Sequence, residues 1–391
     1  MVEKFAKDHA ADTRVIYVVS GSDASRVKEV ADERKIAIPI YADPDGQFSE
    51  HFNVEMTPTL LDFDRDGKLT GTYDSVEMLP GSSESALPRK LDAVVDSGTE
   101  IGTSYDVVVM AADESKARED LAAAREVVHE AEKHLSEWKA DSDISKLNER
   151  AGIEPVEVHG DLLKLIKASA EVSKATGGAF DITWLPLGKL WKDAAGADKL
   201  PSQEEIDAVL KAVDYKHVVV DGDKVSFDNP DTRIGLGAVA KGWIVDAVFL
   251  ALKKRGYENL IVNIGGDLRT AGEGPDGPWT FEITDPYAPS MQIGKFDLQD
   301  GSVATSGNYL RYLEIEGKRY GHIVDPRTGR PATFDGSVSV FTRDCAMADA
   351  LATALFVMGP EEGLKWVRQH DGVDAIYATR DGLQSSLPLD G

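Results

Sequence analysis

The stretch CAMADALATALFVM, residues 345–358, says most about how this chain folds and where its chemistry lies. Its Ala, Leu and Met residues favour an apolar helix. Asp349 and Thr353 are four positions apart, so they lie one turn apart on the same face. A carboxylate beside a hydroxyl suits Mg²⁺, which takes oxygen ligands and binds through one or two carboxylates plus substrate phosphates. In the alternative interpretation, Asp349 faces the helix dipole and Thr353 bonds back to its own turn.

Length and charge narrow the class of protein. A chain of 391 residues favours two domains, or one large domain with insertions. The 68 acidic and 43 basic residues give a formal charge of -25. This charge disfavours nonspecific binding to nucleic acid, because the phosphates would be repelled. An anionic ligand would therefore need a metal ion or helix N-termini, and no apolar run is long enough to predict a transmembrane helix.

The single cysteine, Cys345, excludes an intrachain disulfide and a thiolate metal cluster. Beside an apolar helix it is expected to be a small buried residue rather than a nucleophile. The first residues, MVEKFAKDHAADTR, show no basic region followed by an apolar one, so no secretory signal is predicted. The sequence leaves the localisation of the protein open.

The N-terminal part alternates short predicted elements. Residues 15–20 (VIYVVS) and 38–43 (IPIYAD) are expected as strands, and residues 23–35 as a helix. Residues 57–73 contain two apolar runs joined by Asp-Gly, which predicts a hairpin. Residues 74–98 are rich in Pro, Gly and Ser, as is typical between domains. We therefore expect a first domain with its linker over 1–97 and an α+β domain over 98–391.

The piece VEMTPTLLDFDRDGKLTG, within residues 54–71, is similar to the proline loop and final hairpin of thioredoxin-like domains. In that family the peptide bond before the proline, here Thr57–Pro58, is usually cis and faces the redox cysteines. Those cysteines are absent here, which excludes thiol chemistry in this segment, because the thiolate is the nucleophile. The resemblance also implies an N-terminal truncation, because the chain starts where the second half of the first helix would lie. A spacer or docking module is the expected role.

Four further motifs precede the apolar helix. TGGAFD (176–181) predicts a turn into the core, and IGLGAVAKGW (234–243) predicts a loop that enters a long helix ending at Gly256. Such a helix N-terminus offers free N–H groups to phosphate. NIGGD (263–267) follows a predicted strand, and GHIVDPRTGRP (321–331) forms a loop at the end of another.

The NIGGD and GHIVDPRTGRP motifs contain residues for which the sequence predicts a particular conformation or role. Gly265 and Gly266 are expected to adopt positive φ or to allow close packing, and Asp267 to hold the loop or to lie near a metal. His322 ends the predicted strand RYGHIV. Histidine is the side chain whose ordinary pKa suits proton transfer near neutrality, although a structural role is the alternative.

In this order and spacing, these motifs resemble the FAD:protein FMN transferases of the ApbE family. The resemblance begins near IGTSYDV (101–107) and SEWKADSDISKLN (136–148) and runs to the end of the chain. It implies an α+β flavin transferase domain. It also implies that Mg²⁺ is held by Asp349, Thr353 and the main-chain carbonyl of Ala238, and that His322 is the general base.

The resemblance further implies a set of flavin contacts. Trp138 would lie against the isoalloxazine, where an aromatic face gains about 0.5–1.5 kcal/mol beyond area burial. The other implied contacts are Ile101, Ala179, Phe180, Asp181, Lys241, Thr305 and Ser306. Two positions depart from the family pattern: Gly235 replaces the usual Asp, and Ile101 replaces the usual Met.

The activity implied is transfer of FMN from FAD to a Thr or Ser hydroxyl of an acceptor protein, with release of AMP. The acceptor would be another protein, typically a flavin-carrying subunit of an electron-transport system, because this chain has no acceptor sequence of its own. Two alternatives stay open. The same site would make an FAD pyrophosphatase if water replaced the hydroxyl, and a flavin-binding or partner-docking module would do no chemistry.

Overall fold

The computed structural model describes residues 17–20, 25, 28, 40–43, 47, 60–63, 69–73, 91–309 and 311–388. The chain divides into two compact units, Met1–Lys90 and Leu91–Gly391. Each unit is considered by itself below.

The first unit contains the four strands predicted from sequence. β1 (Tyr17–Ser20) pairs in parallel with β2 (Ile40–Asp43), and β3 (Leu60–Phe63) forms an antiparallel hairpin with β4 (Leu69–Tyr73). Of the helix expected over 23–35, Ser25 and Lys28 are described, and both are helical. The Asp-Gly turn and the Thr57–Pro58 bond lie outside the described residues.

The second unit is built on an eight-stranded sheet in the order β22-β21-β20-β15-β11-β10-β6-β5, with every neighbouring pair antiparallel. Antiparallel pairing with helices on the sheet confirms the predicted α+β class. The strands are β5 (Asp92–Glu100), β6 (Thr103–Ala111), β10 (Leu260–Ile264), β11 (Asp267–Ala271), β15 (Gly301–Gly307), β20 (Ser337–Thr342), β21 (Asp374–Thr379) and β22 (Gly382–Ser385).

The expected boundary between residues 97 and 98 falls inside β5. This strand pairs with β6 along its whole length, from Asp92 to Glu100. A sheet strand of the second unit cannot belong to a linker, so we propose Leu91 as the start of the second domain.

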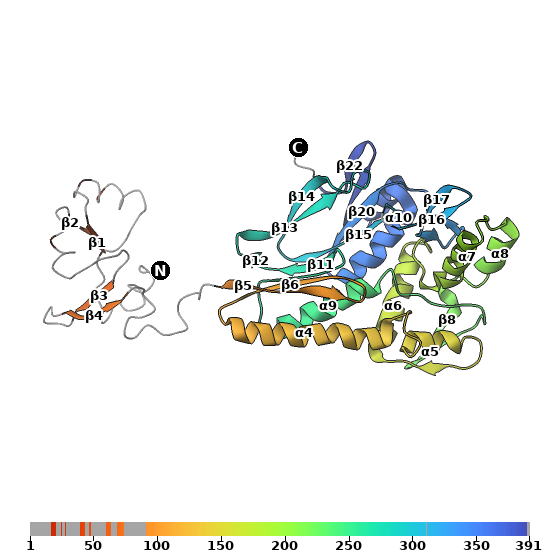
Figure 1. Cartoon of the computed structure of the whole chain (residues 1–391), viewed down its shortest axis with the longest axis horizontal. Helices are drawn as coiled ribbons and strands as arrows, with labels where there is room; N and C mark the ends of the chain where they lie inside the picture. The colour runs from red at the N-terminus through yellow and green to blue at the C-terminus, as the bar shows by residue number, and fades with distance from the viewer. Residues whose placement is uncertain are drawn as a thin grey trace. The chain divides into compact units, whose positions relative to one another are not determined.

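Three helices pack on the sheet around the segments that were predicted to form the site. α4 (Glu114–Leu135) and α9 (Ala240–Lys254) pack on each other and on the β5–β6–β10 part of the sheet (Figure 1). α10 (Cys345–Val367) packs on β15 and β20. Its first part ends where the predicted helix ends, because Gly359 has φ 73° and Pro360 follows. The predicted stop of α9 is also confirmed, since Gly256 has φ 94°.

Smaller elements complete the second unit. Four helices form a lobe beside the sheet (Figure 1): α5 (Asp143–Glu149), α6 (Gly160–Ala175), α7 (Leu185–Gly196) and α8 (Gln203–Leu210), with the 3₁₀ turns η2 (Ile182–Trp184) and η3 (Tyr215–His217). The short strands are β7 (Val156–Glu157), β8 (Val218–Asp221), β9 (Lys224–Phe227), β12 (Glu273–Gly274), β13 (Gly277–Thr284), β14 (Gln292–Leu298), β16 (Tyr312–Ile315), β17 (Lys318–Gly321), β18 (Val324–Asp325) and β19 (Arg330–Pro331).

α9 and α10 meet at a glycine. A Cβ atom placed on Gly242 would lie 2.3 Å from the carbonyl oxygen of Cys345 and 2.6 Å from its carbonyl carbon. Backbone atoms cannot rotate out of the way as a flexible side chain can. Gly242 therefore sets how closely the two helices approach.

We expect Gly242→Ala to lower the free energy of unfolding by about 1–3 kcal/mol, the usual cost of overpacking a core. Urea unfolding of the whole chain measures it. The control is Gly196→Ala at the end of α7, where no atom lies within 4 Å of the added carbon. This control should leave stability unchanged or slightly raised. Equal stability of the two variants would show that the helices separate at little cost.

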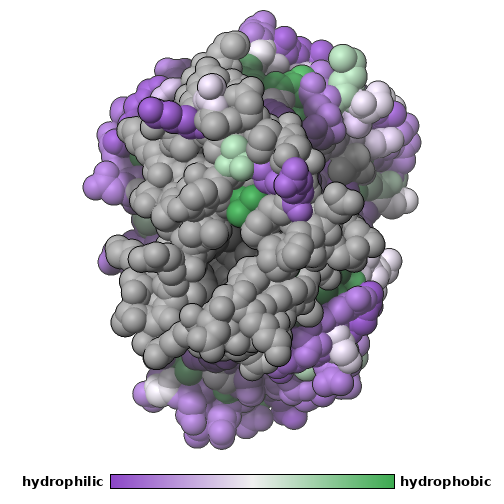
Figure 2. Space-filling view, turned by 90° about the vertical axis from the view of Figure 1, so that its left-hand side faces the viewer, coloured by the Kyte–Doolittle hydropathy of each residue, from purple (hydrophilic) through white to green (hydrophobic). Residues whose placement is uncertain are grey.

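Among the described residues that are visible in Figure 2, hydrophilic ones predominate. Figure 2 shows one face, on which hydrophobic residues form small separate patches. Among the described large hydrophobic side chains, Trp138 is the most exposed, at 85%. Within the same described part of the chain, no helix is both long and apolar enough to cross a bilayer.

Candidate functional site

The start of α9 and the first turns of α10 meet around Asp349. The backbone N–H of Gly242 donates to Asp349 Oδ2 over 3.1 Å, and Asp349 is buried. This contact places a carboxylate against the N-terminal turn of α9, where the helix dipole favours negative charge. The motifs at 234–243 and 345–358, about 100 residues apart in sequence, therefore form one site.

Lys241 and Asp267 complete the charged part of this site. Lys241 Nζ forms an ion pair with Asp267 Oδ2, at the start of β11. Burial opposes the charge on Lys241, but Asp349 and Asp267 raise its pKa. Burial and then the Asp349 carboxylate raise the pKa of Asp267, while Lys241 lowers it. Two buried carboxylates thus lie close together beside one lysine, and a bound cation would relieve their mutual repulsion.

Hydroxyl groups line the same cluster. Thr353, one turn after Asp349, has its Oγ1 3.4 Å from Ser306 Oγ on β15. Thr305, the preceding residue, is exposed and bonds Ser339 Oγ at 2.8 Å. Asp267 directly follows the Gly265–Gly266 loop and interacts with Asp349. Its place near a metal stays a prediction.

The donor set at this point fits Mg²⁺. Among the described residues, no group of three or more His, Cys, Asp or Glu side chains is placed to hold a metal ion. Carboxylates from Asp349 and Asp267 and hydroxyls from Thr353 and Ser306 are nevertheless all hard oxygen donors, which Mg²⁺ prefers. Ala238, half-buried and two residues before α9, adds a main-chain carbonyl in the same segment.

Asp246 is a functional residue that the sequence reasoning missed. Its carboxylate accepts from the backbone N–H groups of Cys345 and Ala346, both at 2.9 Å, and pairs with Arg269 at 2.6 Å. It therefore holds the N-terminus of α10 one turn before Asp349. A sequence signal existed: Asp246 is the only charged residue in the apolar run GWIVDAVFLAL.

We expect Asp246→Asn to lower the free energy of unfolding by about 1–3 kcal/mol, because one N–H of α10 loses its acceptor and Arg269 loses its buried partner. Chemical denaturation measures this change. Glu258→Ala is the control, since Glu258 is exposed and contacts only Lys253 near the end of α9. If both variants unfold alike, Asp246 does not hold α10.

Cys345 is buried, as predicted, and burial raises the pKa of its thiol. A neutral, inaccessible thiol is not a nucleophile.

His322 follows β17 and is exposed. Its Nδ1 lies 3.0 Å from the carbonyl oxygen of Arg311. A carbonyl only accepts, so Nδ1 carries the proton and Nε2 of the neutral ring bears a free lone pair. Partial desolvation of the ring lowers its pKa below 6.5, and the hydrogen bond to the Arg311 carbonyl opposes this. His322 therefore has the tautomer and charge state of a base at neutral pH.

His322 connects to the cluster through β15. Asn308, just after this strand, accepts from the backbone N–H of Ile323 over 3.4 Å. Ser306, near the end of the same strand, contacts Thr353. The described contacts thus link the His322 segment to the hydroxyl side of the site.

Ile101 forms the tip of the β5–β6 hairpin. Its φ is 45°, in the left-handed region that costs a β-branched residue energy, and Gly102 follows with φ 75°. The hairpin abuts the Gly265–Gly266 loop, because a Cβ on Gly265 would lie 2.6 Å from Thr103 Oγ1. Gly265 and Gly266 both have positive φ, as predicted. The hairpin therefore lies beside the loop that leads to Asp267.

The second half of the TGGAFD segment, residues 179–181, is buried. Ala179 and Phe180 are buried in the cluster formed with α6 and α10. Asp181 caps η2, where Oδ1 accepts from the Thr183 N–H at 2.8 Å and Oδ2 from the Tyr215 N–H at 2.7 Å. Contact of this triplet with a flavin would therefore use backbone atoms or require the turn to rearrange.

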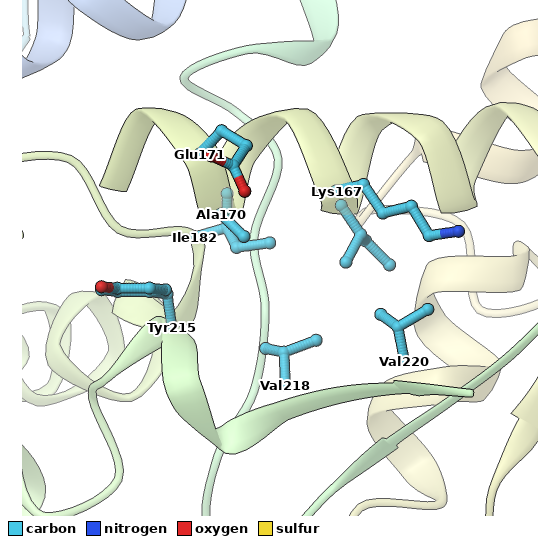
Figure 3. Close-up of a pocket in the computed structure, with 8 residues that line it drawn as sticks. Lys167, Ala170, Glu171, Ile182, Tyr215, Val218 and Val220 are labelled. Carbon is cyan, nitrogen blue, oxygen red and sulfur yellow. The ribbon is translucent and has the colours of Figure 1, made fainter. Parts of the chain in front are cut away.

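A small pocket lies between α6 and β8 (Figure 3). Its volume is about 140 Å³, and the aliphatic side chains of Ile182, Val218 and Val220 line it, with Lys167 and Glu171 from α6. A dinucleotide needs a larger site, of about 300–1,000 Å³. None of the residues predicted for the site lines this pocket, so it is separate from the Asp349 cluster.

Comparison with known families gives two matches. The sequence model described as the ApbE family matches residues 101–377, and the one described as Redoxin matches residues 1–87. A protein of Vibrio cholerae serotype O1 named FAD:protein FMN transferase is 35% identical over 298 residues, covering 74% of this chain and 88% of that protein. One of Escherichia coli strain K12, with the same name, is 29% identical, covering 77% and 89%.

Solved structures of similar proteins give the same family. The flavin transferase ApbE from Vibrio cholerae is similar with a TM-score of 0.66 and 32% identity, covering 75% of this chain and 96% of that one. The ApbE protein from Thermotoga maritima gives a TM-score of 0.68 and 32% identity, covering 75% and 97%. The similar part corresponds in extent to the second unit.

Proposed function

Because the chain belongs to the ApbE family, we propose that it transfers FMN from FAD to a Thr or Ser hydroxyl of an acceptor protein, with Mg²⁺ bound and AMP released. The observation that carries this proposal is the Asp349 cluster. Buried carboxylates and hydroxyls meet there at the N-terminus of α9, which suits both a hard cation and a phosphate.

Asp349, Thr353 and the carbonyl of Ala238 would hold the Mg²⁺. When bound, Mg²⁺ neutralises charge on the pyrophosphate of FAD. The ion pair between Lys241 and Asp267 places a positive and a negative charge side by side next to this site.

The remaining residues position the reactants. Trp138 offers an exposed aromatic face to the isoalloxazine, and the Ile101 hairpin provides an apolar edge. Nε2 of His322 takes the proton from the acceptor hydroxyl as its oxygen bonds to the FMN phosphorus. The P–O bond to AMP breaks, and AMP leaves with the bonding electrons. Positioning and electrostatics carry most of the catalysis in phosphoryl transfer.

The first unit has no cysteine with which to carry out thiol chemistry. It matches Redoxin, yet the only cysteine of the chain is in the second unit. We propose that it is a spacer or a docking module, and that the acceptor is a flavin-carrying protein of an electron-transport system.

The test is to incubate the chain with FAD, Mg²⁺ and a domain that bears an acceptor Thr, and to measure the acceptor's mass. We expect a gain of one FMN that a chelator abolishes. FAD cleaved to FMN and AMP without a gain would make the chain a pyrophosphatase. FAD that stays bound and intact would leave a flavin-binding module.

A further inference from the structure

Glu137 connects two segments of the site that lie far apart in sequence. It belongs to the α4–α5 connection, and its Oε2 accepts from the backbone N–H of Leu236 over 3.1 Å. The N–H of Gly237 also donates to this carboxylate. The two N–H groups belong to the loop that leads into α9, so Glu137 ties the α4–α5 connection to this loop.

Gly235 leaves the room that the Glu137 carboxylate occupies. A Cβ on Gly235 would lie 2.8 Å from Glu137 Oε2, 2.8 Å from Leu185 Cγ and 2.9 Å from Trp184 Nε1. A side chain at 235 and the carboxylate of Glu137 therefore exclude each other. The space that a side chain at position 235 would fill is therefore occupied by the carboxylate of Glu137, which comes from the α4–α5 connection.

The loop is held rigidly on its other sides. Asn148 accepts from the N–H of Ile234 at 2.9 Å and donates to its carbonyl at 2.8 Å. Trp184 Nε1 donates to the Gly235 carbonyl at 3.1 Å. The loop is thus a fixed support, and a group bonded to it takes on its position.

Trp138 is the next residue along the chain from Glu137. The Glu137 side chain points into the protein, whereas Trp138 is 85% exposed. On the other side, Lys139 Nζ pairs with Glu132 at 2.5 Å, and its carbonyl accepts from the Ser142 N–H at 3.1 Å. These contacts fix the backbone on both sides of Trp138, although the side chain itself is largely exposed.

From this geometry we propose that Glu137 is a positioning residue that fixes the α4–α5 connection, and with it the backbone of Trp138, to the α9 loop, so that the indole is preorganised for the flavin ring. The inference rests on the proposed function, because it assumes that Trp138 faces FAD. Without the carboxylate, the connection would lose both of its described hydrogen bonds to the loop, and Trp138 would have to be ordered when FAD binds. That ordering would weaken binding.

The test is a double-mutant cycle on FAD affinity, read from flavin and tryptophan fluorescence. We expect Glu137→Ala and Trp138→Ala each to raise the dissociation constant for FAD about tenfold, which corresponds to about 1.4 kcal/mol. If Glu137 acts through Trp138, the double variant should bind within about twofold of Trp138→Ala alone. Glu137→Gln, which keeps one acceptor oxygen, should fall between Glu137→Ala and the wild type.

Controls separate this inference from the proposed function. Glu130→Ala removes an exposed carboxylate near the end of α4 that bonds only to Lys133 and His134, and it should change nothing. Effects that multiply to about a hundredfold in the double variant would overturn the inference, as would unchanged affinity in Glu137→Ala. If Glu137→Ala does not fold, Glu137→Gln replaces it in the same double-mutant cycle with Trp138→Ala. A wild-type chain that does not bind FAD would overturn the proposed function itself.

Discussion

Asp349→Ala should lower Mg²⁺-dependent turnover at least about a hundredfold. The substitution removes the carboxylate that we assign to the metal, and a metal ion contributes several kcal/mol to stabilising charge in the transition state, where each 1.36 kcal/mol is tenfold in rate. The variant should also require more Mg²⁺ for half-maximal activity. Initial rates of acceptor flavinylation across a Mg²⁺ titration measure both effects.

Asp349 also has a structural role, which the experiment must separate from the catalytic one. Its loss leaves the Gly242 N–H without an acceptor, at a cost of about 1–3 kcal/mol in stability. Asp349→Asn keeps an acceptor oxygen but removes the charge, so it should fold better and remain as inactive. Asp344→Ala is the matched control, since Asp344 precedes α10, is exposed and pairs only with Arg269. Wild-type turnover in Asp349→Ala would show that Asp349 is not a ligand of the metal.

The sequence predicted the parts of the site that depend on local spacing. The 345–358 helix forms as expected, and its i, i+4 pair faces Gly242 and Ser306. The positive φ of Gly265 and Gly266 and the stop of α9 follow from glycine chemistry alone. Such features need no knowledge of which elements pack together.

Contacts between distant elements could not be predicted in this way. Glu137 is one acidic residue among many in a chain with 68, and nothing in its neighbours says that its carboxylate reaches Leu236. The TGGAFD turn was predicted, but the burial of Phe180 depends on how α6 and α10 pack. The expected domain boundary differs from the one that we propose for a related reason. Residues 92–98 read as part of a Pro/Gly/Ser-rich linker, and only pairing with β6 makes them a strand.

His322→Ala should lower turnover about a hundredfold or more and leave FAD affinity within about twofold. A general base contributes about 10²–10⁴ in rate, whereas the ring makes no described contact with the α9 loop or Trp138. Stopped-flow or mass-based flavinylation rates, with separate FAD titrations, measure the two quantities.

The pH profile gives an independent test of His322. Partial desolvation of the ring lowers the pKa of His322 below its usual 6.5, and only the neutral ring can accept a proton. Activity should therefore rise with pH through a pKa below 6.5 and be level above it. In His322→Ala this acid limb should disappear, because the group that titrates is gone.

His370→Ala is the matched control for both measurements. Its Nδ1 lies 2.7 Å from the Trp366 carbonyl, the same kind of contact that His322 makes, but it follows the far end of α10. His370→Ala should keep both the wild-type turnover and the acid limb of the pH profile. If Nε2 of His322 is the base, only His322→Ala should lose both. An unchanged rate in His322→Ala, or an acid limb that persists in it, would assign proton transfer to another group.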